Sequence, residues 1–260
     1  MNTNVKLNHA QKVKNDEFYT PLETVHIIFE QYLKNYDFSD KIIYCPCDSE
    51  KSNFVIYLKE KHNCLKYKEL IYTSDDFNTH RDLFEKADLI ITNPPFSLLI
   101  KQFLPLLKEV KKDFFIFGAK CSISHYYNRY NDINFYMPDC NKKEEYKFML
   151  PDGNIKLVPI VYISNIKGLC FTRPPKALNK SAKISNVYEI GSGYRVYDSI
   201  TKIPYTSEVI LAPITVFFQH YRYMFDIIDS KVEFHKEFRG YSDGKKRYTR
   251  IAVRIKSEYL

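Results

Sequence analysis

Short, mostly apolar runs alternate with helical patterns over residues 41–119, and this alternation limits the fold more than any other feature of the chain. Four runs have strand length: KIIYCPC (41–47), KELIYTS (68–74), DLIIT (88–92) and DFFIFGA (113–119). Strands that are apolar throughout, rather than at every second position, are typical of a parallel sheet buried on both faces. The sequence therefore predicts an α/β protein with a mostly parallel sheet.

Helix signals fill the segments between these runs. Pro21 suits the first turn of a helix, and Thr20 before it suits an N-cap. Four helices are expected. The first starts at Pro21, and the second runs from a cap at Ser49 or Ser52 to about His62. The other two cover residues 79–86 and 97–111. Beyond residue 120 the sequence becomes irregular, with short β-like runs. We therefore expect a first part over 1–120 and a second over 121–260, which completes the core and forms a further surface.

Composition narrows the class of protein. Lys and Arg exceed Asp and Glu by 39 to 31, and residues 231–260 carry nine basic and four acidic side chains, 9 − 4 = 5 of the net charge of +8. The six cysteines show no paired spacing, so no metal site is expected. No segment is long and apolar enough for a signal peptide or a membrane span. We expect a soluble cytoplasmic protein without membrane contact.

Polar turns follow three of the apolar runs. They are CPCD (45–48), SDDF (74–77) and TNPPF (92–96). In open parallel sheets, ligands bind beyond the carboxyl ends of the strands, where loops lead into helices. These three turns are therefore the candidate ligand site.

The Asn-Pro-Pro-Phe turn has a chemistry of its own. Two prolines leave the Asn93 amide and the nearby carbonyls outside regular secondary structure, and Phe96 offers a flat apolar face. An amide oxygen, a carbonyl and an aromatic ring suit the binding of a planar base by its amine and its face. The alternative interpretation is a strand-ending turn in which Asn93 is a cap and Phe96 packs in the core.

The chain resembles EcoRI-type adenine-specific DNA methyltransferases over roughly residues 15–256. The resemblance is carried by five segments in the same order: NDEFYTP (15–21), YCPCDSEKSNF (44–54), ADLIITNPPFSL (87–98), APITVFF (212–218) and DGKKRYTRIAVRIK (243–256). It implies a Rossmann-like S-adenosylmethionine-dependent methyltransferase fold with a mixed, mostly parallel sheet. An irregular α+β C-terminal part would recognise DNA.

The resemblance also implies an activity, transfer of a methyl group from S-adenosylmethionine to the exocyclic N6 amine of an adenine flipped out of duplex DNA. Asn93 and the Pro94 carbonyl would accept hydrogen bonds from the target amine, Pro95 would shape the turn, and Phe96 would stack on the base. Catalysis would come mainly from positioning, without a strong general base.

The family pattern further assigns a cofactor site. Its residues would be Phe18, Tyr19, Thr20 and Pro21, then Cys45, Pro46, Cys47 and Asp48, then Asp75, Asp76 and Phe77. The glycines usual after the first strand are replaced here by Cys and Pro, so Asp48 is the expected polar contact. Each group also has a purely structural interpretation: a helix start, a buried strand end and a helix N-cap. The pattern does not specify which acid binds the ribose, and Glu69 is a candidate.

DNA would be bound by basic residues near the C-terminus: Lys245, Lys246, Arg247 and Arg250. A solvated strand face is the alternative for these residues, and the loop 173–186 and the stretch 124–131 are rival recognition elements. Expected partners are double-stranded DNA and a cognate restriction endonuclease, with the enzyme acting as a monomer. Two other functions stay open: an RNA adenine methyltransferase, and a non-catalytic DNA-binding relative.

Overall fold

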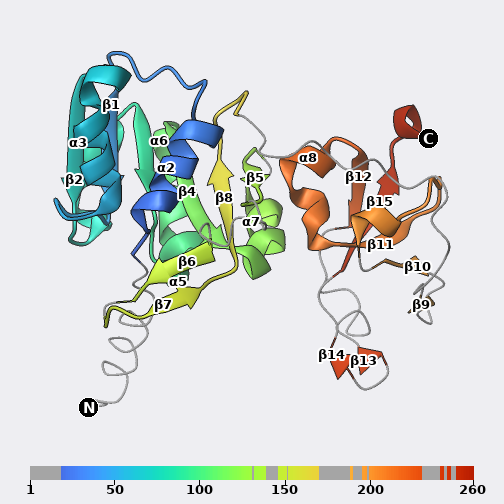
Figure 1. Ribbon diagram of the computed structural model, residues 1–260. Coiled ribbons are helices and arrows are strands. Elements are labelled where there is room, and N and C mark those ends of the chain that lie inside the picture. Colours follow the sequence, from blue (N-terminus) through green and yellow to red (C-terminus); the bar gives the residue numbers. More distant parts are fainter. Residues whose placement is uncertain are drawn as a thin grey trace, which may run out of the picture. The chain divides into compact units, whose positions relative to one another are not determined.

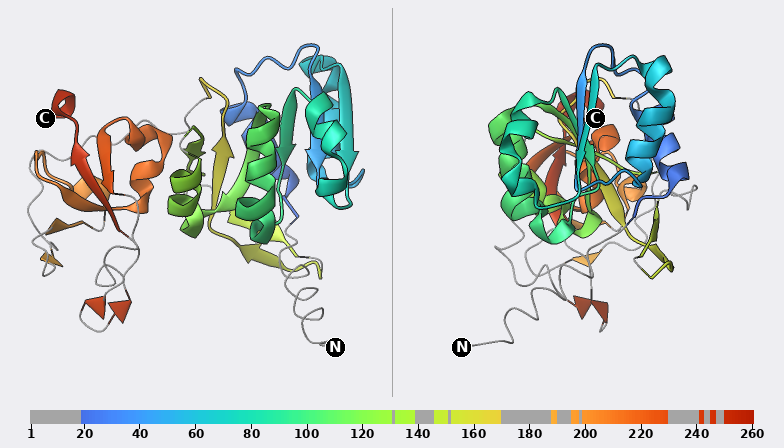
Figure 2. Two further views of the ribbon diagram at one scale, coloured as in Figure 1. Left: turned by 180° about the vertical axis from the view of Figure 1, so that it is seen from behind. Right: turned by 90° about the vertical axis from the view of Figure 1, so that its left-hand side faces the viewer.

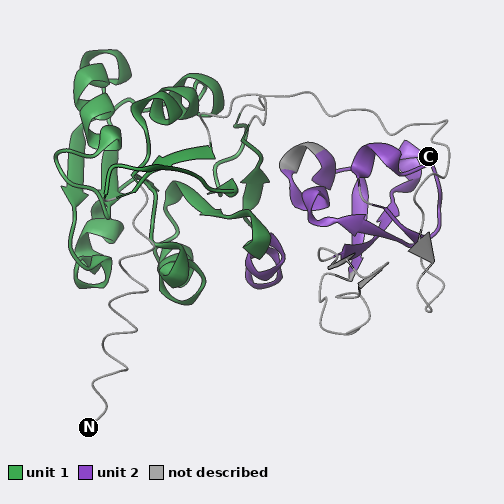
Figure 3. Ribbon diagram, turned by 60° about the horizontal axis from the view of Figure 1, so that its bottom comes forward, with its two compact units in different colours: residues 1–122, 132–172 green, residues 123–131, 173–260 purple. Residues whose placement is uncertain are grey.

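The fold was analysed in a computed structural model of the 260-residue chain. It describes residues 19–130, 132–138, 146–150, 152–169, 188–189, 195–197, 199–229, 241–242, 245–246 and 250–260. Within these ranges, no helix has both the length and the apolar character needed to cross a membrane. The chain forms two compact units, residues 1–122 with 132–172 and residues 123–131 with 173–260 (Figure 3).

Unit 1 is built on a six-stranded sheet in the order β2-β1-β3-β4-β8-β5 (Figure 1). The strands are β1 (Ile42–Pro46), β2 (Glu69–Thr73), β3 (Leu89–Thr92), β4 (Asp113–Ala119), β5 (Asn134–Tyr136) and β8 (Ile160–Ser164). Strands β1 to β4 are mutually parallel, while β8 is antiparallel to both β4 and β5. The predicted mixed, mostly parallel sheet is confirmed, and all four predicted strands are present.

Helices cover both faces of this sheet, as the end-on view in Figure 2 shows. They are α2 (Leu22–Ile27) with the π-helical η1 (Ile28–Tyr32), α3 (Asn53–Leu65), α4 (Arg81–Lys86), α5 (Phe96–Leu98) with the π-helical η3 (Leu99–Phe103), and α6 (Leu104–Val110). Ile43 and Cys45 of β1 face the core beneath α2 and α3. Tyr44 points to the other face, where its ring lies 5.0 Å from that of Phe84 in α4. This alternation explains why the strand is apolar at every position.

Two predicted helices differ from the observed ones. The helix expected over 97–111 consists of α5, η3 and α6, and Pro105 stands in the first turn of α6. Proline lacks an amide hydrogen, so a helix can pass this residue only where that bond is not required. The first helix begins one residue later than predicted, because Pro21 takes the N-cap position. The predicted cap at Thr20 is therefore wrong.

A short antiparallel hairpin, β6 (Lys147–Met149) and β7 (Ile155–Leu157), precedes β8 in unit 1. Because β8 starts opposite the end of β4, with Ile160 paired to Ala119, the hairpin belongs to the edge where the parallel strands end (Figure 1). It leaves three apolar side chains exposed: Met149, Ile155 and Leu157.

Unit 2 contains a second sheet, of five strands in the order β12-β15-β11-β10-β9. They are β9 (Tyr188–Glu189), β10 (Arg195–Val196), β11 (Ile210–Pro213), β12 (Phe225–Asp229) and β15 (Arg250–Ile255), with β13 (Tyr241–Ser242) and β14 (Lys245–Lys246) forming a separate pair. Helix α7 (Ile123–Arg129) belongs to this unit, because its Tyr127 ring packs 4.4 Å from that of Phe217 in η7 (Ile214–Phe217).

The remaining helices of the described chain are short. They are the 3-10 turns η2 (Phe77–Thr79), η4 (Lys120–Ser122), η6 (Ile200–Lys202) and η10 (Ser257–Tyr259), and the α-helix α8 (Gln219–Arg222). Since compactness alone does not define a functional domain, the division of roles at residue 120 stays a prediction.

Candidate functional site

The candidate site lies where the order of the parallel strands reverses. From β1 the chain moves outward to β2, then returns to place β3 on the other side of β1. Such a reversal leaves an opening between the loops at the carboxyl ends of the two central strands, and α/β proteins bind ligands there. The turns after β1 and β3 are the CPCD and TNPPF turns. The structure therefore brings these two predicted segments together.

The turn after β1 combines burial with an unusual backbone. Cys45 is fully buried and belongs to the core, whereas Cys47 follows the strand with φ of +65°. That left-handed conformation favours glycine, because a side chain there costs roughly 1–2 kcal/mol. A glycine-like backbone is thus retained at Cys47 without the glycine. Burial, with smaller contributions from Asp48 and Asp76, raises the pKa of the Cys47 thiol to about 12, so the thiol is protonated at neutral pH.

Asp48 is the most constrained acid of the site. Its carboxyl oxygen Oδ2 lies 2.7 Å from the Thr92 hydroxyl, and its backbone amide donates to the Thr73 carbonyl at 2.9 Å. Thr92 is the last residue of β3 and also hydrogen-bonds the carbonyl of Pro46. Burial raises the pKa of Asp48 to about 7, although hydrogen bonds from Thr92 and Ser52 lower it. Thus Asp48 and Thr92 join the ends of β1, β2 and β3.

The Asn-Pro-Pro-Phe turn follows Thr92 directly. Pro94 is buried, while Asn93 and Pro95 are partly exposed. Pro95 is the N-cap of α5, and its carbonyl accepts a hydrogen bond from the Leu98 amide at 3.1 Å. Phe96, the first residue of α5, is partly exposed and packs against the core of unit 1. Phe96 is thus neither fully buried nor fully exposed, and its predicted stacking role stays a prediction.

The Tyr19-Thr20-Pro21 segment is held by hydrogen bonds to two other parts of unit 1, the β6–β7 hairpin and the start of α3. Tyr19 forms a two-way backbone bridge with Met149 of the hairpin, at 2.8 and 3.0 Å, and its side chain is exposed. The Thr20 carbonyl accepts a hydrogen bond from the Asn53 side chain at 2.7 Å. The Thr20 hydroxyl is buried, and within the described chain it has no hydrogen-bond partner. Phe18 lies outside the described residues.

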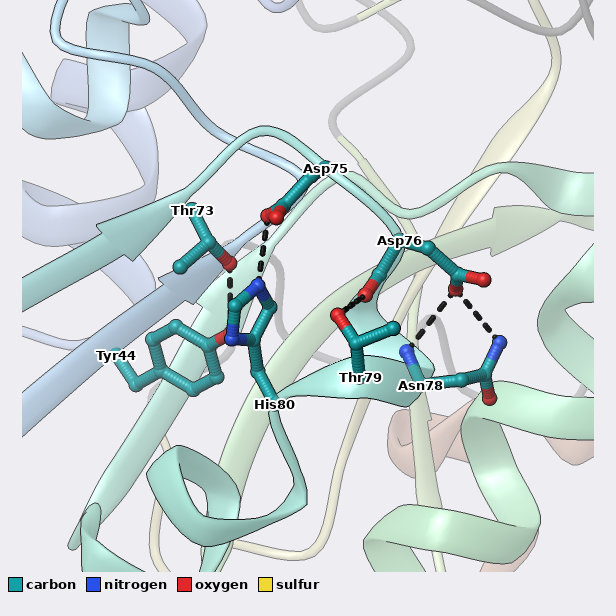
Figure 4. Close-up of polar contacts among 7 residues, drawn as sticks. All are labelled: Tyr44, Thr73, Asp75, Asp76, Asn78, Thr79 and His80. Carbon is teal, nitrogen blue, oxygen red and sulfur yellow. Dashed lines mark hydrogen bonds and ion pairs between the residues drawn. The ribbon is translucent and has the colours of Figure 1, made fainter.

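The acidic turn after β2 forms a network of its own (Figure 4). Asp76 is the N-cap of η2 and accepts hydrogen bonds from the backbone and side-chain nitrogens of Asn78 at 3.0 and 2.8 Å. Asp75 is exposed and lies 2.8 Å from the His80 ring, a contact that holds its pKa below the usual range. Phe77 is buried, with its ring 4.9 Å from that of Phe103. The turn is thus well ordered by local bonds, and its role toward a cofactor stays a prediction.

The predicted DNA-binding residues of the C-terminal part do not lie on one element. Lys245 and Lys246 form β14, and Arg247 lies outside the described residues. Arg250 begins β15 and is buried, so a phosphate contact would require this side chain to leave its present environment. Arg254, four residues later on the same strand, is exposed.

Sequence reasoning assigned no individual role to two residues of the site. Thr92 carried a signal, since it is a polar residue in the otherwise apolar run that precedes Asn93. Asn53 carried none, because its bond to Thr20 joins segments 33 residues apart. The exposed hairpin was also not foreseen. Among the residues that the structure describes, no group of three or more His, Cys, Asp or Glu side chains could hold a metal ion.

Comparison with known families bears directly on these turns. The family model described as adenine-specific methyltransferase EcoRI matches residues 6–82 and 75–135, together residues 6–135 and hence half of the 260-residue chain. The chain belongs to this family. The matched region of the EcoRI methyltransferase family contains β1, β2, β3 and all three polar turns. The sheet order fits the S-adenosylmethionine-dependent methyltransferase fold that the resemblance implied.

Curated relatives bear similar names. The chain is 30% identical over 146 residues to the type II methyltransferase M.MgeORF184P of Mycoplasma genitalium, covering 45% of each protein. It is 28% identical over 169 residues to the type II methyltransferase M.EcoRI of Escherichia coli, covering 47% of this chain and 51% of that one. The type II methyltransferase M.MpnI of Mycoplasma pneumoniae is 27% identical over 146 residues, again with 45% of each chain covered. The chain thus spans about half the length of the curated relatives it matches.

Proposed function

We propose that this protein is a DNA adenine-N6 methyltransferase that uses S-adenosylmethionine. The observation that carries the proposal is the junction at the strand reversal, where Thr92 joins Asp48 and Pro46 to the turn that contains Asn93. This junction puts a polar, glycine-like turn and an amide-bearing turn at the edge where α/β proteins bind ligands. Membership of the EcoRI methyltransferase family supports the same conclusion.

The residues of the β1 turn fit the cofactor. Asp48 offers a buried carboxyl group, the backbone at Cys47 allows close approach, and the Thr20 hydroxyl still lacks a hydrogen-bond partner within the described chain. S-adenosylmethionine, when bound, supplies an activated methyl group. Tyr19, Thr20 and Asp48 would hold it, and the capped Asp75-Asp76-Phe77 turn lies at the end of the adjacent strand.

On the substrate side, the chain would orient the amine rather than activate it by a strong base. Asn93 and the Pro94 carbonyl would accept hydrogen bonds from the adenine amine, and its proton would leave after transfer. An amine inside a duplex cannot reach a buried cofactor, so the adenine must be flipped out. The ring of Phe96 would stack on the flipped base, and such stacking is worth about 1–3 kcal/mol.

Binding of the duplex would fall to the C-terminal part of the chain. The stretch 231–260 carries most of the excess positive charge, and Arg254 is exposed on β15. Such residues contact phosphates and supply affinity more than sequence choice. The relatives are named type II methyltransferases. The proposal therefore includes a partner restriction endonuclease that acts on the same DNA sequence.

The proposal is tested by tritium transfer from labelled S-adenosylmethionine to unmethylated duplex DNA, followed by separation of the nucleosides. We expect label in N6-methyladenine. Label only in a matched structured RNA would favour the RNA methyltransferase, and duplex binding without cofactor binding would favour the non-catalytic relative. Asn93→Ala is the matched variant: it should bind the cofactor, measured by calorimetry, but transfer almost no label.

A further inference from the structure

The Thr92 hydroxyl faces two oxygen atoms of the β1 turn at the same time. It hydrogen-bonds the carbonyl oxygen of Pro46 and lies 2.7 Å from Oδ2 of Asp48. Thr92 is 1% exposed and Asp48 is 8% exposed, so water does not readily replace either contact. A buried junction of this kind must satisfy its polar atoms internally.

The number of available hydrogen atoms limits which hydrogen bonds Thr92 can form with these two oxygens. A threonine hydroxyl carries one hydrogen, so it can donate fully to only one of the two oxygens. A carbonyl oxygen can only accept. Both contacts can be complete hydrogen bonds only if Asp48 carries a proton and donates to Thr92, while Thr92 donates to Pro46. If Asp48 is ionised, Thr92 must turn its hydrogen toward Asp48, and the bond to Pro46 is lost.

The surroundings of Asp48 favour the protonated form. Burial raises the pKa of Asp48 to about 7, and this effect exceeds the opposing one of its hydrogen bonds. Among the described residues, no cationic side chain forms an ion pair with it. The groups that act on this carboxyl are Cys45 on β1, Cys47 in the turn, Thr92 on β3 and Ser52 before α3. The Thr73 carbonyl on β2 is bonded to the backbone amide of Asp48 instead. Both thiols have raised pKa values, so neither adds a charge at neutral pH.

We propose that Thr92 is a positioning residue that couples the protonation state of Asp48 to the turn containing Asn93. With Asp48 protonated, Thr92 bonds both oxygens and ties β3 firmly to the β1 turn. A cationic ligand beside Asp48 favours the carboxylate, so the proton passes to the solvent and Thr92 releases Pro46 to bond Asp48. Binding of the ligand would therefore shift the position of the turn that contains Asn93. The identity of that ligand, S-adenosylmethionine, rests on the proposed function.

The first test needs no ligand. In the full chain labelled with ¹³C-aspartate, carboxyl NMR signals are followed from pH 4 to 9. One aspartate should titrate near pH 7, and its signal should be absent from Asp48→Asn. Thr92→Val should move this midpoint upward, because the charge-assisted bond that is lost favoured the carboxylate. Thr92→Ser, which keeps the hydroxyl, should leave the midpoint unchanged.

Ser164→Ala is the matched control for a buried hydroxyl. Ser164 is fully buried on β8 and donates to the Phe114 carbonyl at 2.6 Å. It lies beside the start of β4, whereas the candidate site lies beyond the ends of the parallel strands. This variant should leave the midpoint of Asp48 unchanged. The inference is overturned if every aspartate titrates below pH 5, or if Ser164→Ala moves the midpoint as far as Thr92→Val does.

The second test adds S-adenosylmethionine in calorimetry, in buffers of different ionisation enthalpy. Wild type should release part of a proton on binding at pH 6 and almost none at pH 8.5, while Asp48→Asn should release none at either pH. Thr92→Val should lower turnover on the order of tenfold, since small misplacements of reacting groups are costly. Cofactor binding without proton release at pH 6 overturns the inference and leaves the proposed function standing. No cofactor binding at all contradicts the proposed function, and the titration still decides whether Asp48 is protonated.

Discussion

Replacing Asp48 with asparagine should stabilise the ligand-free protein at high pH. Burial raises the pKa of this carboxyl from its ordinary 3.8 to about 7. The folded protein therefore keeps a proton up to about pH 7 that the unfolded chain loses near pH 4. Stability falls as pH rises through this window, because unfolding releases the proton. At 1.36 kcal/mol for each pH unit, the loss amounts to at most about 4 kcal/mol.

Asparagine removes the titration and keeps the shape of the side chain. Its amide can donate to Thr92 as the protonated acid would. The free energy of unfolding is measured in urea by far-UV circular dichroism at pH 4.5 and pH 8, since the chain has no tryptophan for fluorescence. The advantage of Asp48→Asn over wild type should grow by several kcal/mol between these two pH values.

Asp152→Asn provides a control of opposite sign. Asp152 is exposed, and hydrogen bonds from Asn154 hold its pKa below the usual range. Its stabilising effect is present at neutral pH and lost in acid, so its replacement should give no advantage at pH 8. If the difference between Asp48→Asn and wild type is the same at both pH values, the argument from burial is refuted.

Three further outcomes follow from the site. Asn93→Ala should lower methyl transfer at least about a hundredfold while cofactor affinity by calorimetry stays unchanged, since only positioning of the amine is lost; a fully active variant would remove Asn93 from the mechanism. Phe96→Ala should slow methylation of a paired adenine more than that of a mismatched one, because the mismatch lowers the cost of flipping; equal losses would assign the ring to core packing. Cys47→Gly should raise the free energy of unfolding by about 0.5–1 kcal/mol, by removing left-handed strain at φ of +65°; a loss in urea unfolding would mean that thiol packing outweighs the strain.

The parallel part of the fold was predictable because burial on both faces leaves a direct trace in the sequence. Every second residue of β1, such as Tyr44, meets helices on one face, and its neighbours Ile43 and Cys45 meet helices on the other. The candidate site at the ends of these strands was inferred from the same pattern. What the pattern could not supply was pairing between distant residues, such as the bridge from Tyr19 to Met149. No local periodicity encodes such a contact.

The surroundings of individual side chains were harder to predict than the arrangement of the strands. The sequence identified Asp48 as a polar residue after a strand, but its burial depends on the packing of β1, β3 and α3 together. Arg250 illustrates the opposite case. In the sequence it belongs to a basic run, yet in the sheet it pairs with Pro213 and is buried. Arg254, which strand alternation places on the same face of β15, is exposed, so alternation alone does not account for the burial of Arg250.

Helix α7 has a consequence for how this chain can be divided or exchanged. Residues 123–131 belong to unit 2, although the chain then returns to unit 1 for residues 132–172. Tyr127 packs on Phe217 and accepts a hydrogen bond from Arg222 at 2.8 Å. A single cut at residue 172 would therefore separate α7 from the residues that cover it. Recombination between relatives cannot transfer unit 2 as one C-terminal block: its inheritance requires two separate gene segments that stay matched to each other.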